Sequence, residues 1–174
     1  LADTLTITPG GNGVSLDGPF GDGVATDSSN LVSRALSLTG RNAHVHITKN
    51  IPSGGGLGGG SADAAAILNW AGFTDLETAS RLGADVPFCM IGGRARVRGI
   101  GEAIDILPPV QRKITLVIPP FGVSTPAVYR AWDDLAKTGN NTTNDQNDLQ
   151  QAALIVEPRL IEWHDKIAQA CGQA

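Results

Sequence analysis

Residues 54–60 form the stretch of the sequence best suited to chemistry. Six of these seven residues are glycine, and Leu57 is the exception. Because glycine lacks a Cβ atom, such a backbone can turn successive N–H groups into one concavity. The alanine-rich segment 62–71 predicts a helix directly afterwards, whose unpaired N–H groups and positive dipole end would face the same place. The pattern therefore predicts a phosphate-binding loop. A flexible linker or a tight strand-to-helix turn is the alternative, and Leu57 with the immediate helix argues against a linker.

Other phosphate and metal motifs are not matched by the sequence. No Gly-Lys-Ser/Thr closes the glycine-rich stretch, and it lacks the βαβ unit and acidic partner of a dinucleotide-binding loop. His44 and His46 share one face of a predicted strand. No third metal ligand is within sequence reach, so we interpret them as the wetter side of that strand. Cys89 and Cys171 have neither metal nor redox spacing, which is typical of thiols in a reducing compartment.

Composition and charge narrow the class of protein. The chain has 174 residues, of which 41% are hydrophobic and 17% charged, as in globular proteins. Its formal net charge of −4 argues against binding to nucleic acid or to an anionic membrane surface. No apolar run reaches the roughly 18 residues needed to span a bilayer. We therefore expect a cytoplasmic protein with neither a nucleic acid nor a membrane as partner.

Hydrophobic patterns place the glycine-rich stretch within a mixed α and β chain. Strands are predicted at 5–8, 14–16, 44–47, 94–98 and 114–118, the last with the continuous apolar character of a central strand. Helices are predicted at 31–38, at 62–71, from Thr74, from Thr125, and at 160–171 before Gly172. The predicted fold class is α+β. Pro108 and Pro109 indicate a boundary between two lobes, 1–110 and 111–174.

Residue types at the helix ends support these assignments. Asn30 is a suitable N-cap for the first helix, and Gly40 is suited to a left-handed stop after it. Thr74 has capping-box spacing with a glutamate three residues later. Thr125 is the expected N-cap of a helix whose first position is a proline. The polar segment 138–147 predicts a loop.

The glycine-rich stretch also resembles a known family motif. Residues 52–61, Pro-x-Gly-Gly-Gly-Leu-Gly-Gly-Gly-Ser, are similar to the second motif of the GHMP kinases. Further similar segments follow in the family's order, namely LGADVPF at 82–88, GIGE at 99–102, GVSTPAVY at 122–129 and NDL at 147–149. The resemblance implies a two-lobed GHMP-kinase-like fold, with a first lobe like ribosomal protein S5 and a second α+β lobe.

Within the GHMP kinases, the triple glycine after Leu57 resembles the branch that phosphorylates a sugar alcohol linked to cytidine diphosphate. The resemblance implies transfer of the ATP γ-phosphate to a hydroxyl of this small-molecule substrate, with Mg²⁺, in the non-mevalonate route of isoprenoid biosynthesis. Two alternatives remain open. One is another GHMP kinase, of the homoserine or mevalonate type, and the other is a non-catalytic anion-binding module.

The resemblance also implies roles for single residues. Asp85 would accept the proton of the acceptor hydroxyl or orient that hydroxyl, although at its position it could simply cap a helix. Lys49, Thr125 and Tyr129 would face the substrate together with Asp85, and an amphipathic ring such as Tyr129 suits stacking on cytosine. Asn30 would lie near adenine. The expected nucleotide contacts are Gly54, Gly55, Gly56, Leu57, Gly58, Gly59, Gly60, Ser61, Asn30 and Asp63.

Two parts of the family pattern have no counterpart in the sequence. The family's Lys-x-Asn-Leu and Asp-Gly-Tyr-His segments are not found, nor is its late glycine-rich motif. A serine that holds magnesium in many members corresponds to Gly60, so the metal ligands stay unassigned, with Ser61 as the candidate. We therefore expect a partial second lobe, and little or no kinase activity from the 174-residue chain alone.

Overall fold

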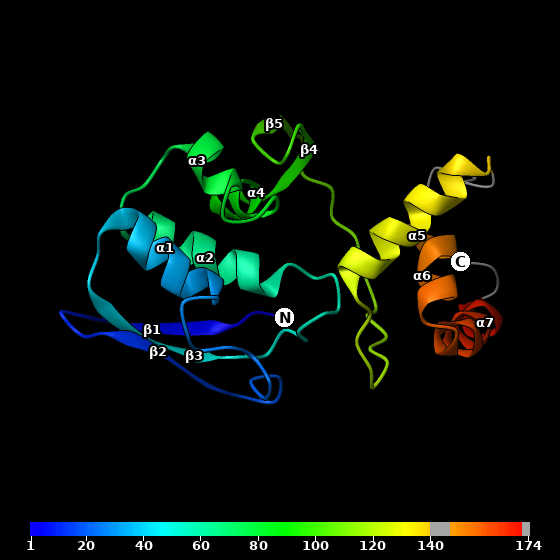
Figure 1. Cartoon of the computed structure of the whole chain (residues 1–174), viewed down its shortest axis with the longest axis horizontal. Helices are drawn as coiled ribbons and strands as arrows, with labels where there is room; N and C mark the ends of the chain where they lie inside the picture. Colours follow the sequence, from blue (N-terminus) through cyan, green and yellow to red (C-terminus); the bar gives the residue numbers. More distant parts are fainter. Residues whose placement is uncertain (140–146, 172–174) are drawn as a thin grey trace. The chain divides into compact units, whose positions relative to one another are not determined.

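The computed structural model describes residues 1–139 and 147–171 and shows an α+β architecture (Figure 1). The chain divides into two compact units. Leu1–Ser53 with Leu57–Thr115 form the first unit, and Gly54–Gly56 with Leu116–Ala174 form the second. The main division along the chain falls between Thr115 and Leu116, and the lobe boundary expected at residue 110 stays a prediction. None of the helices in the described ranges is long and apolar enough to cross a membrane.

A three-stranded sheet forms the base of the first unit. It contains β1 (Thr4–Pro9), β2 (Gly13–Asp17) and β3 (Ala43–Thr48), in the order β1-β3-β2. β1 runs antiparallel and β2 parallel to β3. The start of β1 and the ends of β2 and β3 therefore lie at the same end of the sheet. Val45 and Ile47 are buried on one face, and His44 and His46 alternate with them on the other. All three strands confirm predictions.

Helices α1 (Leu31–Thr39) and α2 (Gly59–Trp70) cover one face of this sheet (Figure 1). Asn30 is the N-cap of α1, and its Oδ1 accepts a hydrogen bond of 2.8 Å from the N–H of Val32. Gly40 ends α1 with a φ of +62°. Both ends agree with the sequence. The core between helices and sheet is aliphatic: Val32, Ala35, Leu36, Val45, Ile47, Ala64, Ala65, Ile67 and Leu68.

Two short helices and a hairpin complete the first unit: α3 (Leu76–Ser80), α4 (Val86–Ile91), β4 (Arg94–Arg98) and β5 (Ala103–Leu107). α4 packs on α2, and the Asn69 side chain donates a hydrogen bond of 3.1 Å to the carbonyl of Met90. The expected N-cap at Thr74 is wrong, because Asp75 caps α3 by accepting from the N–H of Thr78 at 3.1 Å. β5 is not predicted from the sequence.

The second unit contains α5 (Thr125–Lys137), α6 (Gln150–Val156) and α7 (Arg159–Cys171). α5 and α7 confirm predicted helices, whereas α6 is not predicted. Ser124 occupies the N-cap position of α5, so Thr125 is already helical, which corrects the expected cap by one residue. Residues 140–146 of the predicted loop, and the predicted stop at Gly172, lie outside the described residues.

The predicted strand at 114–118 is not formed. Residues 111–119 have no regular secondary structure, and Ile114 is 75% exposed. A strand exists only when a neighbouring strand takes up its hydrogen bonds, and neither sheet in the described residues pairs with this segment. Apolar composition therefore misleads here. Over its described residues the second unit contains the helices α5, α6 and α7.

Candidate functional site

The glycine-rich loop connects the end of β3 with the start of α2. Gly54, Gly56 and Gly58 have φ values of +72°, +68° and +67°, in the left-handed region that favours glycine. These residues recur at every second position, an alternation that can turn neighbouring N–H groups to the same side. The backbone of the loop thus requires glycine for the reason that the sequence indicates.

The first turn of α2 offers N–H groups without helical partners. The first hydrogen bond of the helix runs from the N–H of Ala62 to the carbonyl of Gly58, at 2.9 Å. The N–H groups of Gly59, Gly60 and Ser61 come before it and have no partner within the helix. The N-cap residue Gly58 has no side chain that could occupy them. The helix dipole adds partial positive charge at the same end. This turn can therefore bind an anion such as a phosphate group.

A pocket of about 220 Å³ lies beside this turn, between the segments that leave the parallel strands β2 and β3. Its lining combines aliphatic and polar residues: Leu16, Val24, Ala25, Ser29, Asn30, Leu31, Ile47, Lys49, Ser53, Gly60 and Asp63. The Asn30 side chain donates a hydrogen bond of 2.7 Å to the carbonyl of Ala25 and so fixes one wall. The structure thus brings four predicted site residues together, namely Asn30, Lys49, Gly60 and Asp63.

Lys49 and Asp63 belong to a buried charged cluster at this pocket. Lys49 Nζ donates to Asp63 Oδ2 at 2.8 Å and also to Asp3 Oδ2, and each of these three side chains is at most 6% exposed. Asp63 is therefore a buried ion-pair partner and not a solvated charge at a helix start. The contact of Lys49 with substrate stays a prediction. The structure gives its ammonium group two carboxylate partners within the chain.

Burial and pairing shift the pKa values of these groups in different directions. Burial alone would raise the pKa of Asp3, but the hydrogen bonds from Lys49 and from the amides of Ile51 and Asn50 outweigh it and lower that pKa. Burial alone would lower the pKa of Lys49, but the bonds to both carboxylates outweigh it and raise that pKa. Burial, with the nearby charge of Asp3, raises the pKa of Asp63 despite Lys49. Asp63 is thus the carboxylate that takes up a proton first as the pH falls.

Asp85 occupies the N-cap position of α4, with an exposed carboxylate that makes no capping hydrogen bond. The side chain of Asp85 therefore does not cap α4. The segment before Asp85 packs against the first turn of α2, because a Cβ on Gly83 would lie 3.8 Å from Ser61 Oγ. The structure thus brings the predicted catalytic segment to the end of α2 that carries unpaired N–H groups.

Two residues that the sequence does not assign to the site, Arg34 and Gly101, contact the segment that precedes Asp85. The Arg34 guanidinium of α1 donates hydrogen bonds of 3.2 Å to the carbonyls of Arg81 and Leu82. Gly101 of the GIGE turn packs so closely that a Cβ there would overlap the carbonyl oxygen of Ala84. The sequence places Gly101 in the GIGE segment at 99–102, but it gives no signal of the contact with Ala84. Arg34 carries no sequence signal for this contact.

Substituting Gly101 with alanine should lower the free energy of unfolding by about 3 kcal/mol and disturb the start of α4. Its φ of +113° is a conformation that alanine rarely adopts, and the new Cβ has no room against Ala84. Urea unfolding followed by circular dichroism measures the effect. Gly72→Ala is the matched control, because Gly72 also has a positive φ but no atom within 4 Å of a Cβ. Equal losses in both variants would contradict the steric argument.

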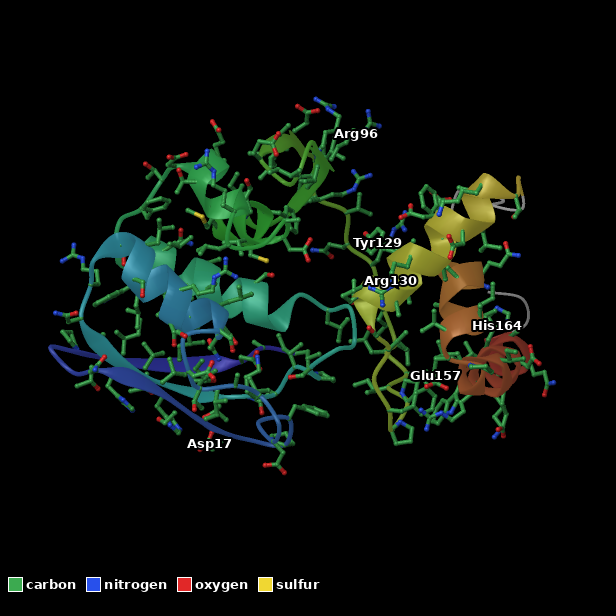
Figure 2. The ribbon with its side chains drawn as sticks, viewed as in Figure 1. Asp17, Arg96, Tyr129, Arg130, Glu157 and His164 are labelled. Atoms are coloured by element: carbon green, nitrogen blue, oxygen red, sulfur yellow. The ribbon has the colours of Figure 1, made fainter. Side chains whose placement is uncertain are left out.

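Thr125 and Tyr129 belong to the second unit, so the structure does not place them against Asp85. Both lie on the first two turns of α5, and Figure 2 shows Tyr129 beside Arg130. The Tyr129 side chain is not part of a core, since the residue is 53% exposed. The predicted substrate contacts of both residues stay predictions.

His44 and His46 lie on the sheet face opposite the helices and bond to neighbouring strands. Ser15 Oγ lies 3.0 Å from His44 Nε2 and 2.9 Å from His46 Nδ1, and Asp17 pairs with His46 at 3.1 Å. Figure 2 shows Asp17 at this outer face. In the ranges that the structure describes, no group of three or more His, Cys, Asp or Glu residues could hold a metal ion.

Comparison with known proteins assigns this site to a family. The family model described as GHMP kinases N terminal domain matches residues 29–93. A crystal structure of 4-(cytidine 5'-diphospho)-2C-methyl-D-erythritol kinase matches with a TM-score of 0.64 and 30% identity, covering 98% of this chain and 70% of that one. The chain belongs to the GHMP kinase family.

Relatives within the GHMP kinases share one name. The 4-diphosphocytidyl-2-C-methyl-D-erythritol kinase of Paracoccus denitrificans is 46% identical over 136 residues, which cover 75% of this chain and 48% of the relative. The enzyme of that name from Ruegeria pomeroyi is 35% identical over 183 aligned positions, covering 91% of this chain and 66% of the relative. The chain therefore spans about half to two thirds of the length of these relatives.

The GHMP kinase match confirms the predicted family and the α+β fold class. The matched range 29–93 contains Asn30, Lys49, the glycine-rich loop, Asp63 and Asp85. It thus covers most of the pocket lining, the first turn of α2 and the segment packed against it, whereas Leu16, Val24 and Ala25 of the lining lie outside it. Asp3 lies outside this range, as do Thr125 and Tyr129.

Proposed function

We propose that this chain is the nucleotide-binding and catalytic part of a kinase that transfers the ATP γ-phosphate to the 2-hydroxyl of 4-diphosphocytidyl-2-C-methyl-D-erythritol. The observation that carries the proposal is the packing of Gly83, two residues before Asp85, beside Ser61 in the first turn of α2, whose N–H groups have no helical partners. The names of the relatives support the acceptor. The reaction belongs to the non-mevalonate route to isoprenoids and takes place in the cytoplasm.

The donor nucleotide would occupy the pocket and the first turn of α2. The aliphatic walls formed by Leu16, Val24 and Ile47 suit the faces of an adenine ring, and Asn30 supplies a polar group at its edge. The N–H groups of residues 59–61 would hold phosphate oxygens, which are anionic. Positioning and electrostatic stabilisation therefore do most of the catalytic work.

Asp85 would act on the acceptor hydroxyl. As the hydroxyl oxygen forms its bond to the γ-phosphorus, the Asp85 carboxylate accepts the hydroxyl proton. The bond between the γ-phosphorus and the β–γ bridging oxygen breaks, and ADP leaves. A carboxylate is basic enough if the transition state is loose, because the hydroxyl then needs little activation. The Asp85 residue is exposed and its carboxylate makes no capping hydrogen bond to α4, which is consistent with this role.

Magnesium prefers oxygen ligands, and it would neutralise charge on the phosphate groups when bound. The Ser61 hydroxyl is half-buried at the start of α2, beside the segment that carries Asp85. The carboxylate of Asp63 is already paired with Lys49. Ser61 is therefore the proposed ligand among the residues of this helix turn. Thr125 and Tyr129 are proposed to contact the cytidine end of the substrate.

The test is ATP-dependent phosphorylation followed by ³¹P NMR, with three acceptors offered separately to the chain. We expect a weak phosphomonoester signal that grows slowly with 4-diphosphocytidyl-2-C-methyl-D-erythritol, and none with homoserine or mevalonate. Because the chain alone is expected to have low activity, the assay uses high protein concentration and long incubation. Binding of fluorescent methylanthraniloyl-ADP with Mg²⁺ is measured in parallel. Nucleotide binding without transfer to any acceptor would favour a non-catalytic module, and transfer to another acceptor would favour a different GHMP kinase.

A further inference from the structure

Asp3 reaches the nucleotide pocket through the register of the sheet. Thr4, the first residue of β1, pairs with Thr48, the last residue of β3. Because the two strands are antiparallel, the residue before Thr4 lies opposite the residue after Thr48. These residues are Asp3 and Lys49, and their side chains form an ion pair in the buried cluster. Asp3 lies outside the range matched by the family model.

The Asp3 carboxylate binds the entrance of the glycine-rich loop with one oxygen. Oδ1 accepts hydrogen bonds from the N–H groups of Asn50, at 2.6 Å, and Ile51, at 2.8 Å. The Asn50 side chain returns a hydrogen bond of 3.1 Å to the carbonyl of Ala2. The backbone that leads into Pro52 and the glycines is therefore fixed to the residues that precede β1.

The other oxygen of Asp3 faces the exit of the loop. Oδ2 accepts from Lys49 Nζ, which also donates to Asp63 on α2. A Cβ on Gly59, the first residue of α2, would lie 3.3 Å from Asp3 Oδ2 and 2.9 Å from Ile51 Cγ2. Asp3 thus lies where the two ends of the loop approach each other.

We propose that Asp3 is a positioning residue of the nucleotide site, which clamps the base of the glycine-rich loop by joining the Asn50 and Ile51 amides to the Lys49–Asp63 pair. The clamp holds the loop entrance against the first turn of α2, so that the unpaired N–H groups stay beside the pocket. Asp3 itself does not line the pocket and need not touch the nucleotide. This inference rests on the proposed function.

Two variants of Asp3 separate the loop clamp from the ion pair. Asp3→Asn loses the charge that faces Lys49 but keeps an oxygen that can accept from the Asn50 and Ile51 amides. Asp3→Ala loses both. The matched control is Asp105→Asn, which removes an ion pair of 2.7 Å to Arg98 on the exposed β4–β5 hairpin. Affinity for methylanthraniloyl-ADP with Mg²⁺ is measured by fluorescence at a temperature where circular dichroism shows each variant folded.

We expect the dissociation constant to rise about threefold for Asp3→Asn and at least about tenfold for Asp3→Ala, with no change for Asp105→Asn. Hydrogen exchange followed by mass spectrometry supplies a second measurement that does not need the nucleotide. Peptides spanning 49–58 should exchange faster in Asp3→Ala, while peptides from α2 keep the protection of the parent chain. A general loss of structure would instead raise exchange in both.

The outcomes distinguish this inference from the function on which it rests. If the parent chain binds the nucleotide and Asp3→Ala binds it equally well, Asp3 has no positioning role. Equal losses in the Asn and Ala variants, with unchanged exchange at 49–58, would also overturn the clamp and leave only an ion pair. A parent chain that binds no nucleotide overturns the proposed function itself. If neither variant folds, Ile51→Pro, which removes one clamped N–H, takes their place, and unchanged affinity there overturns the inference.

Discussion

Replacing Lys49 with methionine should lower the free energy of unfolding by about 3–5 kcal/mol at pH 7. The substitution keeps most of the side-chain volume but leaves the carboxylates of Asp3 and Asp63 buried without their shared cation. Removing one partner of a buried ion pair is costly because the remaining charge stays out of water. Urea unfolding, followed by circular dichroism, measures the loss.

The loss should shrink as the pH falls from 7 to 5. The pKa of Asp63 is already raised in the folded protein, and without Lys49 it rises further. A group whose pKa is raised on folding binds its proton more tightly in the folded state, so it stabilises that state at low pH and loses this effect as the pH rises. The difference between the parent chain and Lys49→Met is therefore largest near neutrality.

Lys137→Met is the control for this experiment. Lys137 pairs with Asp134 at 2.8 Å on the surface of α5, where both side chains are 73% exposed. Surface ion pairs of this kind contribute little to stability, so the variant should unfold almost as the parent does at both pH values. A loss for Lys49→Met that is the same at pH 5 as at pH 7 would argue against buried charge as its cause.

Asp85→Asn should reduce phosphoryl transfer about 10²- to 10⁴-fold without weakening nucleotide binding. The amide has the shape of the carboxylate but cannot accept the hydroxyl proton. Because the Asp85 side chain is exposed and makes no capping hydrogen bond, the variant should unfold at the same urea concentration as the parent. The measurements are single-turnover transfer from radiolabelled ATP and titration with methylanthraniloyl-ADP.

The matched control is Asp17→Asn, on the outer face of the sheet, where the carboxylate pairs with His46. It changes the same functional group on the sheet face opposite the helices, outside the pocket lining, and should leave both transfer and nucleotide affinity unchanged. Transfer by Asp85→Asn within about threefold of the parent would remove Asp85 from the chemistry. A fall in nucleotide affinity equal to the fall in transfer would instead assign Asp85 to nucleotide binding.

The first unit could be predicted well where hydrophobic pattern and end signals agree. The alternation around Val45 and Ile47 marks a half-buried strand, and Asn30 and Gly40 mark the ends of α1. The helix after the glycines follows from its alanine content. These signals are local, so a single sequence contains them in full. The anion-binding character of the loop has the same origin, because it depends on missing Cβ atoms and a helix start.

The errors arise where neighbouring residues compete or where a partner decides the structure. Asp75 and Ser124 take N-cap positions that the sequence assigns to Thr74 and Thr125, because short polar residues next to each other are almost equivalent caps. The segment 114–118 has strand-like composition but no strand beside it. Composition reports only what a segment would prefer if a partner were present.

The buried cluster could not be predicted for a related reason. Asp3 is separated from Lys49 by more than forty positions and precedes an ordinary amphipathic strand, so its partner follows only from the pairing of β1 with β3. The resemblance assigns both Lys49 and Asp63 to the site, but it does not indicate their mutual ion pair. Long-range pairs of this kind need the register of the sheet before they can be seen.

β1 runs antiparallel and β2 parallel to β3, so the two ends of the sheet carry different connections. We expect these two ends to tolerate insertions differently. The chain turns at Gly10, after β1, and at Gly40–Arg41, before β3. Both turns lie at the end of the sheet opposite the pocket, and these residues are exposed. An inserted epitope or a fluorescent label at Gly10 or Arg41 should therefore be accepted without altering ligand capture. Length changes between residues 18 and 30, or between 49 and 58, would reshape the opening itself. We therefore expect homologues that prefer other ligands to differ in the segments that correspond to residues 18–30 and 49–58. Variation at the turns that correspond to Gly10 and Gly40–Arg41 should not change the ligand that is bound.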